Sequence, residues 1–320
     1  MWHPPELFLQ EKKNMVKTVI KQATTIEEQI ERLKERGMII RSDEFAKMYL
    51  WNIGYYRLGF YWFPYEQDYP QKVNRNHLFN EGTDFSTIMT LYDFDSTLRS
   101  MLSAALLKIE VDIRAKVIYL ISNLHKQSPA WFADSRVVSR DFIEDFTEKY
   151  NREIINNEVI RNHARYHIND RFAPAWKTLE FLSFGDLQRL IASLKSDRDR
   201  MMIYNCYGFD EKKSFPNYID VIRILRNYCA HGHPLFDFHF SRSIRAGKFK
   251  RVMKGKQIAS NFYSSIQGAL VLTQYFLYYL PENQGDIFRD RLRNYFSFIP
   301  SDIEPVVGFL KDTPWLEKKL

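Results

Sequence analysis

The segment Ile222–Phe236 (IRILRNYCAHGHPLF) places an arginine, an asparagine and two histidines near the end of an expected helix. Ile222 and Leu225 have the three-residue spacing of a stripe that faces a hydrophobic core. Gly232 and Pro234 are typical signals for the end of a helix. We therefore expect a helix from about Phe215 to Ala230 whose last turn carries the reactive side chains.

Arg226, Asn227 and His231 have the side chains that metal-independent RNA cleavage requires. In this reaction the RNA 2′-hydroxyl attacks the neighbouring phosphate, which needs a base, an acid and stabilisation of a charged phosphorane. Imidazole suits proton transfer near neutral pH, and guanidinium offers forked donors to phosphate oxygens. Arg226 and His231 would point about 140° apart on an ideal helix. Both can face one phosphate only if His231 lies at the fraying end, and Asn227 would orient its neighbours.

The spacing of an arginine followed by a histidine has low specificity, and the chain contains two further matches. Arg161, Asn162 and His167 (RNHARYH) fit the same loose pattern in a polar segment without a stop signal, and Arg226 also reaches His233. We favour His231 and assign His233 a possible assisting role. The structural alternative is that Arg226 pairs with an acid and His231 interacts with the helix dipole.

Long helices must position these residues, because apolar side chains recur at helical spacing along most of the chain. We expect one that runs through Arg36, capped by Thr24 or Thr25 with Glu28 placed for a capping box and stopped at Gly37, and a second from Asp43 to about Ile53. A long central helix should run from Phe85 to about Ser122. Further helices are expected at 141–169, 174–182, 185–195, 197–206 and 257–280. The expected fold is all-α, in the form of a helical bundle with an N-terminal helical extension.

The central helix carries two oppositely charged pairs with four-residue spacing, Asp95 with Arg99 and Glu110 with Arg114. They are expected to be structural ion pairs of the bundle. If this helix packs beside the motif helix, however, Glu110 or Arg114 would be placed to orient the catalytic group.

Two other segments have an open interpretation. The aromatic segment 54–65 (GYYRLGFYWFPY) is either core or a surface for stacking on unpaired bases. The connector 242–256 contains no acid, and Phe249 within it is able to stack on a base. Its seven basic residues are either contacts to an RNA backbone or a solvated charge run: Arg242, Arg245, Lys248, Lys250, Arg251, Lys254 and Lys256.

Composition narrows the classes of function. The 320 residues carry a formal net charge of +7, which supports a polyanionic partner. Two cysteines are too few for a disulfide framework or a cysteine-based zinc site, and we expect neither a metal nor another cofactor. The N-terminus lacks the basic start and apolar run of a signal peptide, and 268–280 is too short to span a bilayer. We therefore expect a cytoplasmic protein without a membrane partner.

Several segments together resemble the Abi-like family of bacterial abortive-infection proteins. RNYCAH is similar to the RNxxxH motif of HEPN ribonucleases, and its wider setting adds EEQIERLKERGMII, NIGYYRLGFYWFPY, LYDFDSTLR, KIEVDIR and PAW followed by LSFGDL. These matches cover about residues 24–232. After the motif the chain departs from the family, since HPLFDF replaces a polar continuation that contains tryptophan. The resemblance therefore assigns no role to residues 233–240.

The resemblance implies an all-helical HEPN nuclease that acts as a defence toxin, forms a homodimer and, in some members, has a small noncoding RNA as partner. Because one motif supplies one preferred histidine, a two-fold dimer would complete a composite site. We expect an N-terminal helical region at 1–66, a connector at 67–84 and a HEPN-like domain at 85–320. The alternative is a catalytically silent RNA-binding scaffold with the same fold. A peripheral membrane protein is disfavoured, because the flanks of the apolar helix near Leu270 lack a basic amphipathic face.

Overall fold

The computed structural model describes residues 22–240, 243–246, 249, 253, 255–256 and 258–317. Over these residues the chain forms α-helices and short 3-10 helices, with isolated β-bridges and no extended strand. The expected all-α class is therefore confirmed. No helix in this described part is long and apolar enough to cross a bilayer. The chain divides into two compact units, Met1–Ile88 and Met89–Leu320.

The first unit begins with two helices whose boundaries follow from their caps. α1 (Ile26–Glu35) has Thr25 as its N-cap, and Thr25 and Glu28 form the expected capping box. α2 (Asp43–Ile53) starts after Ser42, whose hydroxyl accepts a hydrogen bond from the Phe45 amide. Gly37 follows α1 with a φ of +93°, a conformation that glycine adopts at little cost.

The aromatic segment forms α3 (Tyr55–Trp62) and the 3-10 helix η2 (Phe63–Tyr65), and it serves both as core and as surface. Leu58, Tyr61 and Trp62 are buried, whereas Tyr56 is 83% exposed. One face of the helix is therefore core, because neighbouring helical positions point in different directions, while stacking of the exposed face on unpaired bases stays a prediction.

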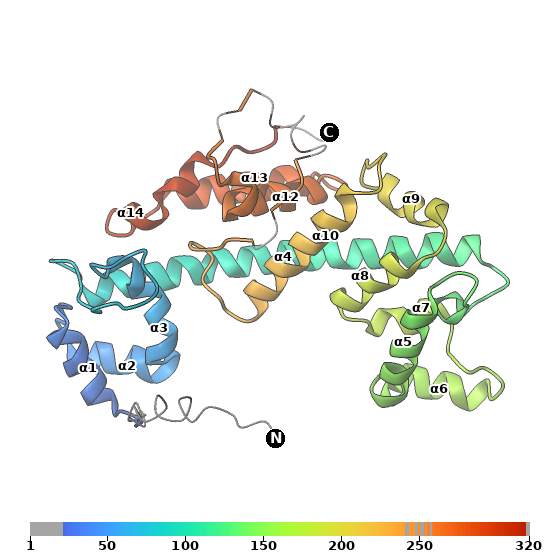
Figure 1. The fold of residues 1–320 in the computed structure, drawn as a ribbon, viewed down its shortest axis with the longest axis horizontal. Coiled ribbons are helices and arrows are strands. Elements are labelled where there is room, and N and C mark those ends of the chain that lie inside the picture. Colours follow the sequence, from blue (N-terminus) through green and yellow to red (C-terminus); the bar gives the residue numbers. More distant parts are fainter. Residues whose placement is uncertain are drawn as a thin grey trace, which may run out of the picture. The chain divides into compact units, whose positions relative to one another are not determined.

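The long helix α4 (Phe85–Leu124) begins in the last residues of the first unit and continues through the second. It has 40 residues and extends roughly 60 Å at 1.5 Å per residue. Figure 1 shows α10 (Ser214–Ala230) crossing this helix. α10 also packs against α8 (Phe184–Ser193) and against α12 (Ile266–Leu277). The end of α10 is thereby held by several elements that are distant in sequence.

The apolar helix expected at 257–280 is shorter than predicted. Its chain forms the 3-10 helix η6 (Phe262–Ser264) before α12 begins after Ser265. Every residue of α12 is buried, and Gln274 is tolerated there because its amide group donates to the Leu316 carbonyl and accepts from the Leu316 amide. α13 (Gln284–Ser297) packs against α12, and α14 (Glu304–Val307) and the 3-10 helix η7 (Gly308–Asp312) follow.

The prediction of a single helix at 141–169 is wrong. The structure has α5 (Arg140–Arg152), the 3-10 helix η4 (Ile154–Asn156) and α6 (Glu158–Tyr166). The break occurs because the Asn157 side chain accepts a hydrogen bond from the Val159 amide and so caps a new helix. The 3-10 helix η3 (Trp131–Ala133) precedes α5. Between α6 and α10 lie α7 (Ala175–Thr178), the 3-10 helix η5 (Leu179–Phe181), α8 and α9 (Asp197–Asn205).

Candidate functional site

The C-terminal end of α10 is anchored in the core and stops at a defined residue. Ile222 and Leu225 are fully buried, as their spacing predicts. His231 is the C-cap, and Gly232 follows with a φ of +67°. The amides of Gly232 and His233 donate to the carbonyls of Cys229 and Tyr228, the two bonds of a Schellman motif. His231 therefore lies just beyond the last helical residue, where its direction is not set by helical periodicity.

Arg226 and Glu110 form a contact between α10 and α4. Arg226 Nε lies 3.5 Å from Glu110 Oε2. The Glu110 side chain is 9% exposed and the Arg226 side chain 43% exposed. The carboxylate thus holds the guanidinium from the protein side, while much of the arginine remains accessible to solvent.

Arg114 fixes the other oxygen of Glu110. Its Nη2 donates to Glu110 Oε1 at 2.9 Å, and its Nη1 donates to the Leu179 carbonyl at 2.7 Å. Glu110 Oε2 is buried and makes no hydrogen bond, so its charge is balanced by the more distant Arg226. A carboxylate between two arginines, one buried and one half exposed, favours keeping the exposed arginine near this position. The proximity on which an assisting role for Glu110 or Arg114 depends is therefore present.

The second charged pair of α4 holds the segment that follows the motif. Asp95 Oδ1 accepts hydrogen bonds from the backbone amides of Leu235 and Phe236, at 2.8 and 3.3 Å. Asp95 Oδ2 accepts from Arg99, whose guanidinium also lies 3.5 Å from the His233 carbonyl. Asp95 and Arg99 are both buried. This pair consequently determines where the chain leaves α10.

The segment that follows α10, residues 233–240, contains the HPLFDF continuation and packs through apolar side chains. Leu235, Phe238 and Phe240 are buried, and Phe238 packs edge-on against Tyr228 of α10 at 4.6 Å between ring centroids. His233 packs at a tilt against the same tyrosine, since its ring centroid lies 4.9 Å from that of Tyr228. The departure from the family pattern after the motif thus has a packing role, which holds the exposed His233 close to the helix end.

The accessible groups at this helix end form a suitable site for an anion. His231 and His233 are exposed, and their ring centroids lie 6.3 Å apart. Asn227 is half-buried in the same turn as Arg226. Cys229 lies on the buried side, and burial raises the pKa of its thiol to about 12, which makes it a poor nucleophile. The Arg226 guanidinium and the two imidazoles are therefore accessible to solvent, whereas the Cys229 thiol is buried.

The basic connector can be followed only in part. Arg245 is exposed, and its amide donates to the Asn217 side chain at 2.7 Å. Lys256 donates to the Trp315 carbonyl at 2.6 Å, and the other five predicted RNA contacts lie outside the described residues: Arg242, Lys248, Lys250, Arg251 and Lys254. Stacking of Phe249 on a base is contradicted. Its side chain is 1% exposed and packs against Tyr218 and Phe262, because the connector folds this apolar residue into the core.

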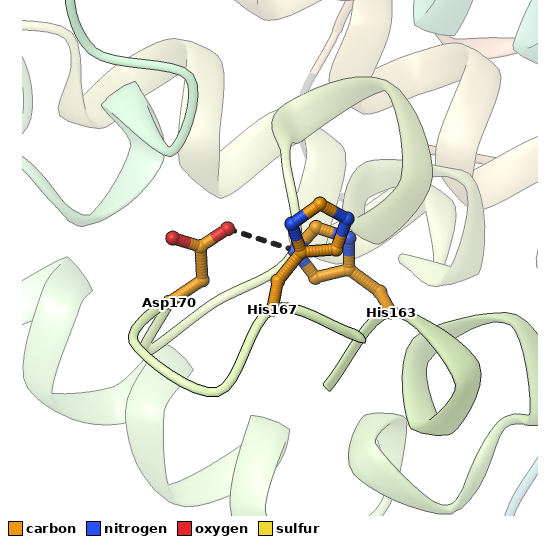
Figure 2. A group of neighbouring side chains, drawn as sticks. All are labelled: His163, His167 and Asp170. Carbon is orange, nitrogen blue, oxygen red and sulfur yellow. Dashed lines mark hydrogen bonds and ion pairs between the residues drawn. The ribbon is translucent and has the colours of Figure 1, made fainter. Parts of the chain in front are cut away.

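The alternative motif at the end of α6 has different surroundings. Arg161 and Asn162 are exposed, and His167 stacks on His163 at 4.3 Å between ring centroids. His163 Nε2 lies 3.1 Å from Asp170 Oδ2 (Figure 2). The sequence expectations did not include this group of three. The signal was present as HARYHIND, in which two histidines are four residues apart and the second precedes an aspartate by three.

Comparison with known proteins gives one match. The family model described as Abi-like protein matches residues 48–237, which is more than half of the chain and includes both α4 and α10. No curated protein and no solved structure gives a significant match.

Proposed function

Because this chain belongs to the Abi-like family, whose name indicates abortive infection and phage defence, we propose that it is a metal-independent HEPN-type endoribonuclease and the toxic component of such a system. The observation that carries the proposal is the geometry at the end of α10. A half-exposed guanidinium is held by a buried carboxylate, and an exposed imidazole lies at the C-cap of the same helix.

Arg226 is proposed to bind the scissile phosphate. Glu110 is nearest to Nε, and the Arg226 side chain is 43% exposed, so the two terminal nitrogens are the proposed phosphate donors. Those nitrogens are suited to donate to two phosphate oxygens as negative charge accumulates in the phosphorane. Glu110 acts as a positioning residue, and Arg114 acts through Glu110.

His231 is proposed to transfer the protons. The 2′-oxygen attacks phosphorus, the bond from phosphorus to the 5′-oxygen breaks, and the products are a 2′,3′-cyclic phosphate and a 5′-hydroxyl. A base must accept the proton of the 2′-hydroxyl and an acid must supply one to the 5′-oxygen. In a homodimer the His231 side chains of two copies would divide these roles, with His233 assisting and Asn227 orienting the group.

RNA is the proposed partner in two senses, as substrate and as a regulator. A small noncoding RNA bound to the basic connector would keep the site occupied until it is displaced. The net charge of +7 and the acid-free connector support attraction to the RNA backbone.

The test is cleavage of labelled single-stranded RNA by the purified protein in EDTA. We expect products with 2′,3′-cyclic phosphate ends, and His231→Ala should lower the rate by about 10²- to 10⁴-fold. His125→Gln is the matched control, because it changes a histidine paired with Asp199 elsewhere in the fold. The proposal is wrong if the wild-type protein and His231→Ala cleave at the same rate.

The second candidate function is a catalytically silent RNA-binding scaffold. The Arg226–Glu110 ion pair favours it, because such a pair also stabilises two crossing helices without chemistry. RNA binding without cleavage, unchanged in His231→Ala, would support the scaffold over the enzyme.

A further inference from the structure

We propose that His163, His167 and Asp170 form a binding site for a divalent transition-metal ion of the Zn²⁺ type. The site lies at the end of α6 and is separate from the Arg226 group. In the described part of the chain these residues are the one group of three potential ligands close enough to share an ion, with their ligand atoms within 4.8 Å of one another.

The helix brings the two imidazoles together. Residues four positions apart lie on the same face of an α-helix, and His163 and His167 stack with ring planes only 16° apart. The chain then turns, because the Asp170 amide donates to the His167 carbonyl at 3.0 Å. This turn returns the Asp170 carboxylate to the histidines, as Figure 2 shows.

Two of the three donor atoms have the spacing of ligands of a tetrahedral ion, and the third would reach the ion if His167 rotated out of its stack on His163. Zinc bonds of about 2.0 Å place neighbouring ligand atoms roughly 3.3 Å apart. The His163 Nε2 to Asp170 Oδ2 distance of 3.1 Å already has this value. His167 is exposed and the Asp170 side chain is 49% exposed, so both are able to rotate toward an ion. Two nitrogens and one oxygen are a common zinc ligand set, which leaves the fourth position for water.

His163 is the buried member of the group. Its side chain is 5% exposed, and its Nδ1 is buried without a hydrogen-bond partner. A buried polar atom in this state costs free energy that an apolar residue of similar size would not. Coordination through Nε2 would leave Nδ1 unpaired, so an ion does not relieve this cost. The proposal therefore depends on the position of Nε2 beside Asp170 and His167.

The flanking residues do not hold this turn by packing. Tyr166 is 84% exposed and Ile168 is 85% exposed, so neither of these large side chains packs against the rest of the protein. An ion would therefore fasten the end of α6 to the following turn by coordination. This role requires no part in RNA cleavage, so the inference stands or falls independently of the proposed nuclease.

The test is calorimetric titration of the metal-stripped full-length protein with Zn²⁺, followed by Co²⁺ substitution. We expect one ion per chain and the visible absorption of tetrahedral Co²⁺. His167→Ala and Asp170→Asn should each weaken Zn²⁺ binding at least about 10-fold and abolish the stabilisation that Zn²⁺ gives against thermal unfolding. Both residues are exposed, so these variants should fold.

Two control variants locate the bound ion. His125→Gln changes a histidine with one carboxylate partner, and His231→Ala changes the histidine at the end of α10; both should bind Zn²⁺ as the wild type does. Absence of stoichiometric binding, or equal binding by His167→Ala, Asp170→Asn and the wild type, would overturn the inference. A loss in His231→Ala alone would place the ion at the other helix end and would also overturn it.

Discussion

Two helix ends in this protein carry the same loose pattern, an arginine and an asparagine followed by a histidine, in different surroundings. At the end of α10, Arg226 contacts the buried Glu110 of a crossing helix and His231 is an exposed cap. At the end of α6, Arg161 is exposed and His167 stacks on a buried histidine near an aspartate. The same residue types thus have different partners at the two ends, and we propose phosphate chemistry for the first and metal coordination for the second.

The largest expected difference between the two ends is in RNA cleavage. Arg226→Ala should lower the cleavage rate about 10²- to 10³-fold, because it removes a donor to the charged transition state. Arg226→Lys should not restore the rate, since an ammonium group cannot replace a planar fork. Arg161→Ala is the matched control at the other helix end and should cleave within about twofold of the wild type in single-turnover assays. Equal losses in the two alanine variants would remove the distinction.

The aspartates beside the two ends should differ in their contribution to stability. Asp95→Asn leaves the buried Arg99 without its counter-charge and weakens the anchor of the segment after α10, so we expect a loss of about 3 to 5 kcal/mol. Asp170→Asn removes a half-exposed partner and should cost less than about 1 kcal/mol in metal-free protein. Urea unfolding measures both. A small effect of Asp95→Asn would show that residues 233–240, which follow the motif, are held mainly by apolar packing.

Neutralising the basic residues near each helix end should have a smaller effect than the substitutions above, and the effect should be on RNA binding. Replacing Lys248, Lys250 and Arg251 together with glutamine should weaken RNA binding and reduce the slope of log affinity against log salt by about two, since each phosphate contact contributes roughly 0.7 on a single strand. The matched control replaces three basic residues in and after α6 with glutamine: Arg161, Arg165 and Arg171. An unchanged slope in the connector variant would show that these three side chains do not contact the RNA backbone.

The smallest expected effect concerns the buried side of the last helical turn. At the end of α10 this position holds the Cys229 thiol, whose pKa burial raises to about 12. At pH 8 only about one thiol in 10⁴ is then ionised, so native Cys229 should react slowly with a thiol reagent. Cys206 is half-buried and should react first. Rapid labelling of both cysteines in the native protein would mean that the end of α10 opens readily.

Local sequence predicted much of the fold. Thr25, Ser42 and Gly37 mark helix ends by their own hydrogen bonds and backbone preferences, and the all-α class follows from apolar spacing along the chain. Prediction was wrong where two signals competed. At 141–169 the helical pattern continued, but the Asn157 cap divided the segment. At Phe249 a basic neighbourhood suggested exposure, whereas the ring is buried.

The sequence by itself determined which side chains can perform chemistry and that α10 ends before His231, because caps, stop signals and residue types are local properties. Only the tertiary structure decided that Glu110 meets Arg226, that Asp95 anchors the segment after the motif, and that Asp170 returns to His163. The first two contacts join residues more than a hundred positions apart, and the third depends on the exact path of a turn. Spacing along a chain does not specify which helices cross or how a turn closes, so these partners follow from packing.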